Sequence, residues 1–395
     1  MAARFWVGQS GGGNYNSTDW ATTSGGTTGQ AAPTSSDDVT FDGAGTFGNT
    51  NCTITASANA LSLTFTTGYT ATITLNATFT LTVAGSFTDR TNHTWTINST
   101  DTGALTINAT STITSNGKTF PGNVSFSGAS ATKTLSGNWT ISGTLSIITN
   151  AQIVNKTASE TITAAGFTDN IGMSGSITLI LSGGTWQGNG GCTITGLQLA
   201  GNVTISGSVT YSTGTLTYTS GTITVTSSTL TVGAATTFNT NGMSFNTIVF
   251  SSGSTMTINS LLTANTLTWQ VTGITFAGTA GWTTGTLNAN GITSAATITL
   301  ANTVTYTVTT SLVIDKSRTG SILTVTSDSG SVKAILTLQN GASCSCLASF
   351  TRIDASNGRA IYTFNGTVTT CNNIFSFSDA LPPAMSKVVS IGGVH

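Results

Sequence analysis

The chain has 395 residues and a formal net charge of -1, and 6% of its residues are charged while 38% are hydrophobic. Threonine contributes 87 residues and glycine 46, whereas charged residues make up roughly 25% of a usual soluble domain. This composition argues against a disordered chain, which combines low hydrophobicity with high net charge. The near-neutral charge gives no reason to expect nucleic acid or an anionic membrane as a partner.

The first 50 residues differ from those that follow, because aromatic and acidic side chains are concentrated there. We expect residues 1–50 to form an N-terminal cap or docking segment, whose key side chains are Trp6, Trp20, Asp37, Asp38 and Asp42. Three carboxylates this close could bind calcium, but an Asx-type turn ahead of a strand at residues 39–41 is the simpler interpretation. The opening residues lack the apolar stretch of a secretory signal, and no window has 18 apolar residues, so we expect no membrane insertion.

From residue 51 to about 340, small or apolar residues alternate with Thr or Ser, as in 71–75 and 296–300. This period of two, with many β-branched residues, predicts short strands that each bury one face. Gly, Asn and Ser separate these strands and supply the turns. Residues 115–120 and 240–245 are similar to each other and are followed by similar strands, which indicates stacked repeats.

We therefore predict an all-β chain, a right-handed parallel β-solenoid with N- and C-terminal caps. The alternative is a tandem of antiparallel β-sandwiches, which would also give short strands at this spacing. Between Pro33 and Pro382 the only proline is Pro121, which favours the solenoid because proline cannot donate to an interior ladder. The predicted body spans residues 51–340, and residues 341–395, where charges return, form the C-terminal cap and tail.

The centre of the chain carries no ordinary catalytic group. Between Asp169 and Asp315 there are 145 consecutive residues without Asp, Glu, Lys, Arg or His. General acid–base catalysis and carboxylate–metal binding both need such side chains. We therefore expect no enzyme activity, no cofactor and no catalytic or metal-binding residue.

Three acidic residues could still serve a polysaccharide depolymerase, which needs two facing carboxylates. They are Asp89, Asp101 and Glu160, the only acids between Asp42 and Asp169. Exposed turn positions are the simpler expectation for all three. His93 is the only histidine before the terminal residue, and we expect it on the surface rather than in a nucleophilic triad.

Aromatic and thiol side chains offer two further candidate sites. Four tryptophans of the repeat region could stack on sugar rings, although packing in the core is the simpler interpretation; they are Trp139, Trp186, Trp269 and Trp282. Three of the five cysteines lie close in sequence without a histidine nearby, so zinc is not expected. Buried free thiols are the expectation, and pairing among Cys344, Cys346 and Cys371 stays open.

The two ends of the chain carry a resemblance to a known class of protein. The segments Arg4–Gly8, Asp19-Trp20, Ser24–Gly26 and Asp37–Asp42, with Pro33, resemble the lead-in of Thr/Gly-rich β-solenoid virion proteins of tailed phages. They are also similar to lead-in repeats of autotransporter passengers. The tail, at 353–358 and 371–375, looks like the closing coil of the same phage-type proteins.

This resemblance implies a non-enzymatic structural protein on the surface of a virion: a fibre, a spike or a capsid decoration, extracellular after host lysis. It implies a homo-oligomer, with a trimer expected first, which contacts other virion proteins and a host surface glycan. The alternatives are a secreted or cell-surface adhesin and a polysaccharide depolymerase. The position on the particle and the identity of a receptor do not follow from the sequence.

Overall fold

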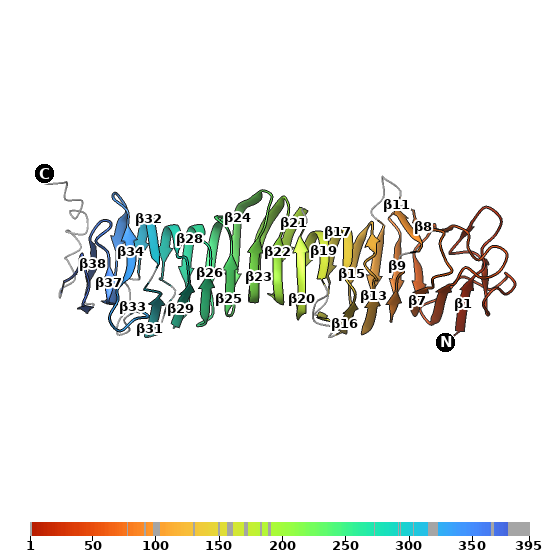
Figure 1. The fold of residues 1–395 in the computed structure, drawn as a ribbon, viewed down its shortest axis with the longest axis horizontal. Coiled ribbons are helices and arrows are strands. Elements are labelled where there is room, and N and C mark those ends of the chain that lie inside the picture. The colour runs from red at the N-terminus through yellow and green to blue at the C-terminus, as the bar shows by residue number, and fades with distance from the viewer. Residues whose placement is uncertain are drawn as a thin grey trace. The chain divides into compact units, whose positions relative to one another are not determined.

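The computed structural model shows an all-β chain in which parallel strands stack into a β-solenoid of about 12 turns (Figure 1). It describes residues 2–76, 78–90, 92–97, 103–128, 131–148, 151–155, 161–169, 173–181, 184–188, 191–271, 273–290, 292, 294–302, 304–314, 323–364 and 367–377. Within these ranges no residue is helical, and so no helix could cross a membrane. The solenoid prediction is confirmed and the sandwich alternative is wrong; the right-handed winding stays a prediction.

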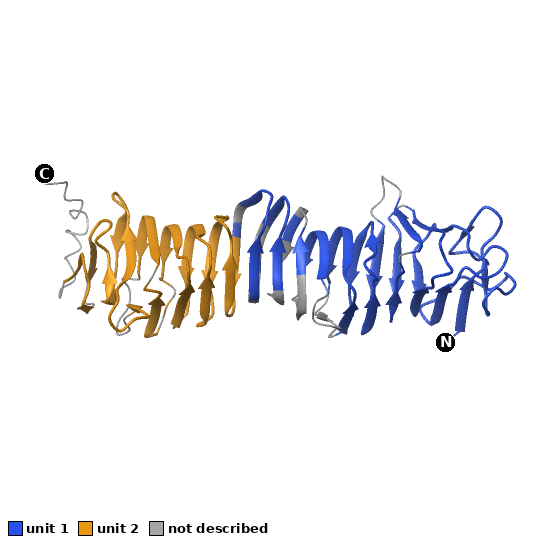
Figure 2. Cartoon of the chain, viewed as in Figure 1, with its two compact units in different colours: residues 1–228 blue, residues 229–395 orange. Residues whose placement is uncertain are grey.

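The chain divides into two compact units, residues 1–228 and 229–395 (Figure 2). In unit 1 the strands line up in three parallel ladders, one for each side of the coil. The first ladder contains β1 (Ala2–Trp6), β4 (Asp37–Phe41), β7 (Ser62–Phe65), β10 (Phe87–Thr88), β13 (Ser111–Thr114), β16 (Ala131–Ser136), β18 (Ala151–Asn155), β20 (Met173–Leu181) and β22 (Gly191–Leu199).

The other two sides of unit 1 are built in the same way. The long strands bend at a corner, so that their two halves pair in different ladders. The second ladder begins with β2 (Gly13–Asn14), β5 (Cys52–Ile54), β8 (Thr72–Leu75) and β11 (Thr94–Ile97), and β14 (Thr119–Phe120) pairs with the start of β17. The third contains β6 (Ala58–Ala60), β9 (Thr80–Val83), β12 (Ala104–Ile107), β15 (Asn123–Phe126), β17 (Trp139–Ile147), β19 (Thr161–Asp169), β21 (Gly184–Gly188) and β23 (Val203–Tyr218).

Unit 2 repeats this arrangement. One ladder contains β24 (Ile223–Val232), β26 (Ser244–Phe250), β28 (Leu262–Trp269), β30 (Trp282–Asn288), β32 (Thr305–Val313) and β35 (Ser343–Ser345). A second contains β25 (Thr236–Asn239), β27 (Thr255–Ile258), β29 (Gly273–Gly278), β31 (Ala296–Leu300), β33 (Leu323–Ser327), β36 (Ala348–Thr351) and β39 (Val368–Thr369). The third runs through the first halves of β26, β28, β30 and β32 to β34 (Ala334–Leu338) and β37 (Ile353–Asp354), and β38 (Ile361–Phe364) pairs with β40 (Ile374–Phe377).

The alternating sequence explains which side chains fill the core. Because strand side chains alternate between faces, every second residue of a rung points inward and stacks on its equivalents in the neighbouring coils. One fully buried stack is Val39, Leu63, Phe87, Ile113 and Leu135, whose members are 22 to 26 residues apart. The adjacent outward row is Thr40, Thr64, Thr88, Thr114 and Ser136. Each buried large apolar side chain contributes about 1.5–3 kcal/mol.

The N-terminal segment closes the first coil with aromatic rings. Trp6 and Trp20 are fully buried, with their ring centroids 5.2 Å apart in an edge arrangement, and Phe41 lies 5.7 Å from Trp6. β3 (Trp20–Ala21) runs antiparallel to the end of β1, which covers part of the edge that an open solenoid would expose. The two tryptophans therefore act inside the cap and cannot dock through their own side chains.

The predicted domain boundaries do not interrupt the stacking. Parallel pairs cross residue 50, since β4 pairs with β7 and β2 with β5, and they cross residue 340, since β32 pairs with β35. The described residues of 2–50 therefore continue the coils of unit 1, with a cap at the N-terminus, and those of 341–377 continue the coils of unit 2. Residues 378–395 lie outside the described part of the chain.

Candidate functional site

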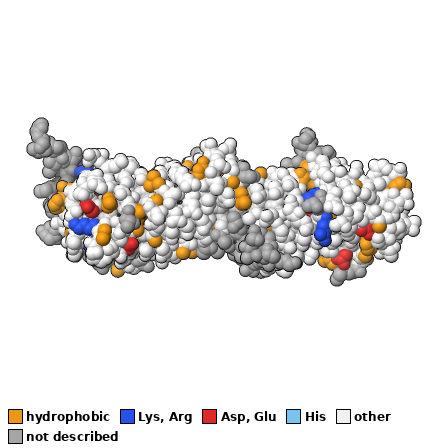
Figure 3. Space-filling model, in the orientation of Figure 1, with side chains coloured by type: hydrophobic (Ala, Val, Ile, Leu, Met, Phe, Trp, Pro, Cys, Tyr) orange, Lys and Arg blue, Asp and Glu red, His pale blue; other side chains and the backbone are white. Residues whose placement is uncertain are grey.

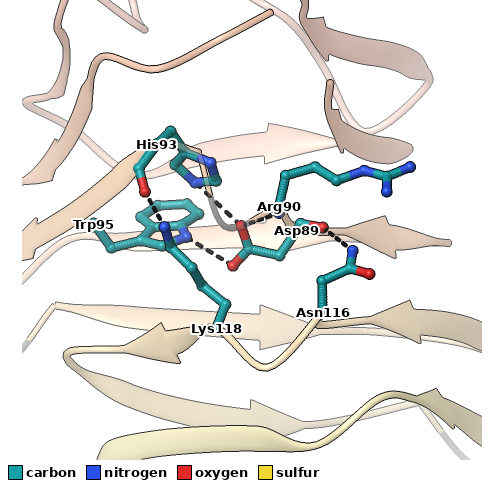
Figure 4. A network of polar contacts seen from close by, with 6 residues as sticks. All are labelled: Asp89, Arg90, His93, Trp95, Asn116 and Lys118. Atoms are coloured by element: carbon teal, nitrogen blue, oxygen red, sulfur yellow. Dashed lines mark hydrogen bonds and ion pairs between the residues drawn. The ribbon is translucent and has the colours of Figure 1, made fainter. Parts of the chain in front are cut away.

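The densest group of ionisable side chains in the described residues lies on the coil corners that follow β10 and β13 (Figure 4). We call this group the Asp89 cluster; its members are Asp89, Arg90, His93, Trp95, Asn116 and Lys118. Asp89 follows β10 directly, and Trp95 lies within β11. Asn116 has a left-handed φ of 49° in the corner after β13. The cluster therefore joins two neighbouring coils.

Hydrogen bonds surround Asp89 on all sides. Trp95 Nε1 donates to its Oδ2 (2.9 Å), and the backbone N–H of Arg90 donates to its Oδ1 (2.8 Å). The Asp89 backbone joins the next coil, because its N–H donates to the Thr114 carbonyl (2.7 Å) and its carbonyl accepts from Asn116 Nδ2 (2.6 Å). Lys118 Nζ donates to the carbonyl of His93. These bonds fix the corner to the coil that follows it.

The imidazole of His93 packs like a core aromatic. Its ring stacks on Phe65 with centroids 4.0 Å apart and an interplanar angle of 16°, and Trp95 contacts it edge-on at 5.6 Å. His93 Nε2 lies 3.1 Å from Asp89 Oδ1, and both side chains are inaccessible to solvent. The expectations that His93 lies on the surface and that Asp89 is an exposed turn residue are therefore wrong. Asp101 and Glu160 lie outside the described residues.

Burial sets the protonation of this pair. It raises the pKa of Asp89 to about 7, against the smaller lowering effects of the Trp95 and Arg90 hydrogen bonds and the Lys118 charge. Burial, with a contribution from Lys118, lowers the pKa of His93 to about 3. Between these values the folded pair holds one proton, on the carboxyl, and both groups are neutral. Neutral forms are what a low-dielectric interior favours.

The pair has a contact found in catalytic triads, but its environment gives it a structural task. An Asp–His contact supports catalysis when the imidazole can reach a nucleophile and a substrate, and here both side chains are fully enclosed. A second carboxylate facing Asp89, as glycoside hydrolysis would need, is not found among the described residues of the cluster. A sequence signal did exist, because 89–93 is the one described stretch where acid, base and histidine occur together in a Thr-rich region.

Lys133 is a second buried ionisable group that sequence reasoning missed. It occupies an inward position of β16, between Ser111 and Ile153 of the adjacent rungs, and is fully buried. Its Nζ donates to the carbonyl of Ser127 (3.0 Å) and to that of Ala109. Burial lowers the pKa of Lys133 to about 8. The alternation of β16 places a lysine where an apolar residue would otherwise lie.

The acidic segment of the N-terminal cap does not form one site. Asp37 and Asp38 are adjacent in β4 and so point to opposite faces. Asp37 Oδ2 accepts from the Thr34 N–H (2.9 Å), and Asp42 Oδ1 accepts from the Ala44 N–H (2.9 Å). Burial opposes ionisation of Asp37, yet the Thr34 hydrogen bonds and the Arg4 charge lower its pKa. Among the described residues no group of His, Cys, Asp or Glu could hold a metal ion.

The four candidate tryptophans are core residues, which corrects the hypothesis that they bind glycans. Their exposed fractions are 0–1%, so they present no ring face to a sugar; they are Trp139, Trp186, Trp269 and Trp282. Trp269 and Trp282 pack edge to face at 6.2 Å. The inward phase of each strand explains this, because every indole falls on the buried set of positions.

The described cysteines are free thiols. Cys52 and Cys346 are buried, and Cys344 and Cys371 are partly exposed. Burial is the largest cause of a raised pKa at all four. The expectation of buried free thiols is therefore confirmed for Cys52 and Cys346, whereas Cys344 and Cys371 are free but partly exposed. The side chain of Cys192 lies outside the described set.

Comparison with known proteins finds no matching family model, no matching curated protein and no matching solved structure. The functional argument therefore depends on the sequence and the geometry of this chain.

Proposed function

We propose that this chain is a non-enzymatic structural protein of a phage virion surface: a fibre, a spike or a capsid decoration. The observation that carries the proposal is the repeating coil of each unit, in which apolar stacks lie inside and rows of hydroxyl side chains lie outside. Figure 3 shows one face, on which most atoms are uncharged and Lys, Arg, Asp and Glu gather in a few places. Such a stack gives a rigid spacer in which each coil contacts its neighbours.

The ionisable groups support this proposal, because the strongest cluster is enclosed and ties coils together. The resemblance of residues 4–42 and 353–375 to phage β-solenoid proteins supports the virion setting. A fold of this class hosts several functions, so the assignment depends on these features together. The proposal includes association of the chain with itself, with a trimer as the first expectation, and with other virion proteins.

Cryo-electron microscopy of intact particles tests the proposal directly. We expect three-sided solenoid density on the particle surface, into which the described coils fit. Particles without such density, together with labelling of the chain on bacterial cells, would favour the adhesin instead.

A reducing-sugar assay on host capsule or lipopolysaccharide tests the depolymerase alternative. We expect no sugar release. Release that an Asp89→Asn variant abolishes would overturn the non-enzymatic assignment.

A further inference from the structure

One side of unit 2 carries an unusually regular row of threonine. The paired residues on the ladder from β27 to β39 form one unbroken outward row: Thr255, Thr275, Thr299, Thr326, Thr351 and Thr369. A second row lies beside it on three of these coils and consists of Thr297, Thr324 and Ser349. We call these nine residues the threonine face.

The fold holds the threonine face in a rigid lattice. Neighbouring rungs are about 4.8 Å apart, and residues two apart along a strand are about 6.7 Å apart. The inward stack of Ile274, Ile298, Val325 and Phe350 is buried and fixes the rungs from behind. Because a β-branched side chain is restricted at χ1, each threonine repeats its methyl and hydroxyl at nearly the same place. The six-residue row is roughly 24 Å long.

The threonine face is also neutral. The strands β27, β29, β31, β33, β36 and β39 contain no charged residue. One described cation reaches the row: Arg352, just after β36, donates from Nη2 to Thr326 Oγ1 (3.4 Å), which itself donates to the Ser327 carbonyl (3.2 Å). Apart from this contact at Thr326, the groups that the row offers to a partner are repeated hydroxyl and methyl groups.

Another side of unit 2 differs in its second row. The ladder from β24 to β35 also has a hydroxyl row: Thr229, Thr247, Thr266, Thr286, Ser311 and Ser343. The row beside it is mixed, because it consists of Thr231, Val249, Thr268, Asn288, Val313 and Ser345. On this side the hydroxyl row has no regular second row of hydroxyls beside it. We therefore use it for the control variants.

We propose that the threonine face binds ice. The two repeats of the face lie close to those of the oxygen lattice on a prism plane of ice, which is a neutral surface that both donates and accepts hydrogen bonds. Hydroxyls at fixed spacing hold waters in that lattice, while the methyl groups fill the spaces between them. Water molecules that the hydroxyls already hold in position lose little further entropy when they become part of a growing ice crystal.

The test is ice growth in solutions of the full chain, measured as thermal hysteresis, crystal shape and inhibition of recrystallisation. Wild-type protein is expected to shape ice and to slow recrystallisation. The double variant Thr299→Lys with Thr326→Lys is expected to lose both effects. The matched control is Thr266→Lys with Thr286→Lys, which adds the same charge at half-buried positions on the other side and is expected to retain them.

Circular dichroism of each variant checks the fold. If the lysine variant of the face does not fold, Thr299→Ala with Thr326→Ala replaces it and is expected to lose the same effects. Unshaped ice with the wild-type protein would overturn the proposal, and so would equal losses in the face and control variants.

Discussion

Replacing Lys133 by methionine should stabilise the protein at neutral pH. Lys133 is fully buried between Ser111 and Ile153 of the adjacent rungs, and its ammonium donates to backbone carbonyls. Burial lowers its pKa from 10.5 to about 8, which means that the folded state disfavours the charged form. Methionine has a similar length and no charge, so Lys133→Met removes this penalty.

The magnitude follows from the pKa shift. Each pKa unit corresponds to about 1.4 kcal/mol, which gives an upper bound of roughly 3 kcal/mol for Lys133. Solvent screening near the coil corner lowers this penalty, and we expect Lys133→Met to raise the free energy of unfolding by about 1–2 kcal/mol. The lost hydrogen bonds cost little, because Ala109 is exposed and water can reach its carbonyl.

The sign of the pH dependence makes the test specific. Between pH 8 and 10.5 the unfolded lysine binds a proton that the folded lysine has lost, so wild-type stability gains from Lys133 as the pH rises. The advantage of Lys133→Met should therefore be complete below about pH 8 and disappear towards pH 10.5. Urea unfolding at a series of pH values measures the free energy of unfolding of both proteins. The tyrosines and cysteines contribute equally to both, so their contributions cancel in the difference.

Thr134→Met serves as the control, since Thr134 lies on the outward face of the same strand, and its effect should not vary with pH. A variant less stable than wild type at pH 7, or an advantage that persists at pH 10.5, would refute this reasoning.

Three further predictions concern the Asp89 cluster, the core and the thiols. In the wild type the contributions of Asp89 and His93 to the pH dependence of stability nearly cancel between pH 4 and 6.5, because the folded and the unfolded pair each hold one proton. In His93→Phe only the raised pKa of Asp89 remains, so stability to urea should fall as the pH rises from about 4 to about 7. A flat profile would contradict the assignment. Trp282→Ala should cost about 3–5 kcal/mol in urea unfolding because it empties a fully buried site, whereas Phe375→Ala, at a side chain 49% exposed, should cost far less. A thiol reagent followed by mass spectrometry should modify Cys344 and Cys371 before Cys52 and Cys346, and equal rates in the folded protein would count against the buried positions.

The period-two pattern predicted the strands and their buried faces, while the similar repeats and the scarcity of proline favoured the solenoid over the sandwich. It also contained the location of the tryptophans, since Trp139 and Trp282 fall on the inward phase of their strands. The glycan hypothesis was wrong because it used only the presence of tryptophan and did not consider whether each tryptophan lies at an inward position of its strand. The cap boundaries differ for another reason: composition changes near residue 50, but the backbone pairing continues across it.

The local sequence at 89–93 indicated a group of acid, base and histidine but could not predict that Asp89 and His93 are buried. Burial of the pair depends on side chains from elsewhere in the coil stack: Phe65 of the preceding coil stacks on His93, and Trp95 donates to Asp89. A stretch of Asp, Arg, Asn and His is typical of a solvated turn, and only the stacking of coils encloses it. The burial of Lys133 could not be predicted either, because a single lysine in an alternating strand can lie on the inward or on the outward face.

The placement of the charges explains why the long faces stay neutral. At a corner the chain leaves the ladder, and backbone N–H groups there need new acceptors. Asp37 and Asp42 accept such groups in the N-terminal cap, and Asp354 Oδ1 accepts the Ser356 N–H (2.9 Å) near the other end. Carboxylates at corners therefore complete the backbone bonding, while the strands between them carry hydroxyl rows. A partner that binds along these faces must match a repeating neutral lattice, and its affinity should change little with ionic strength, because few charges take part.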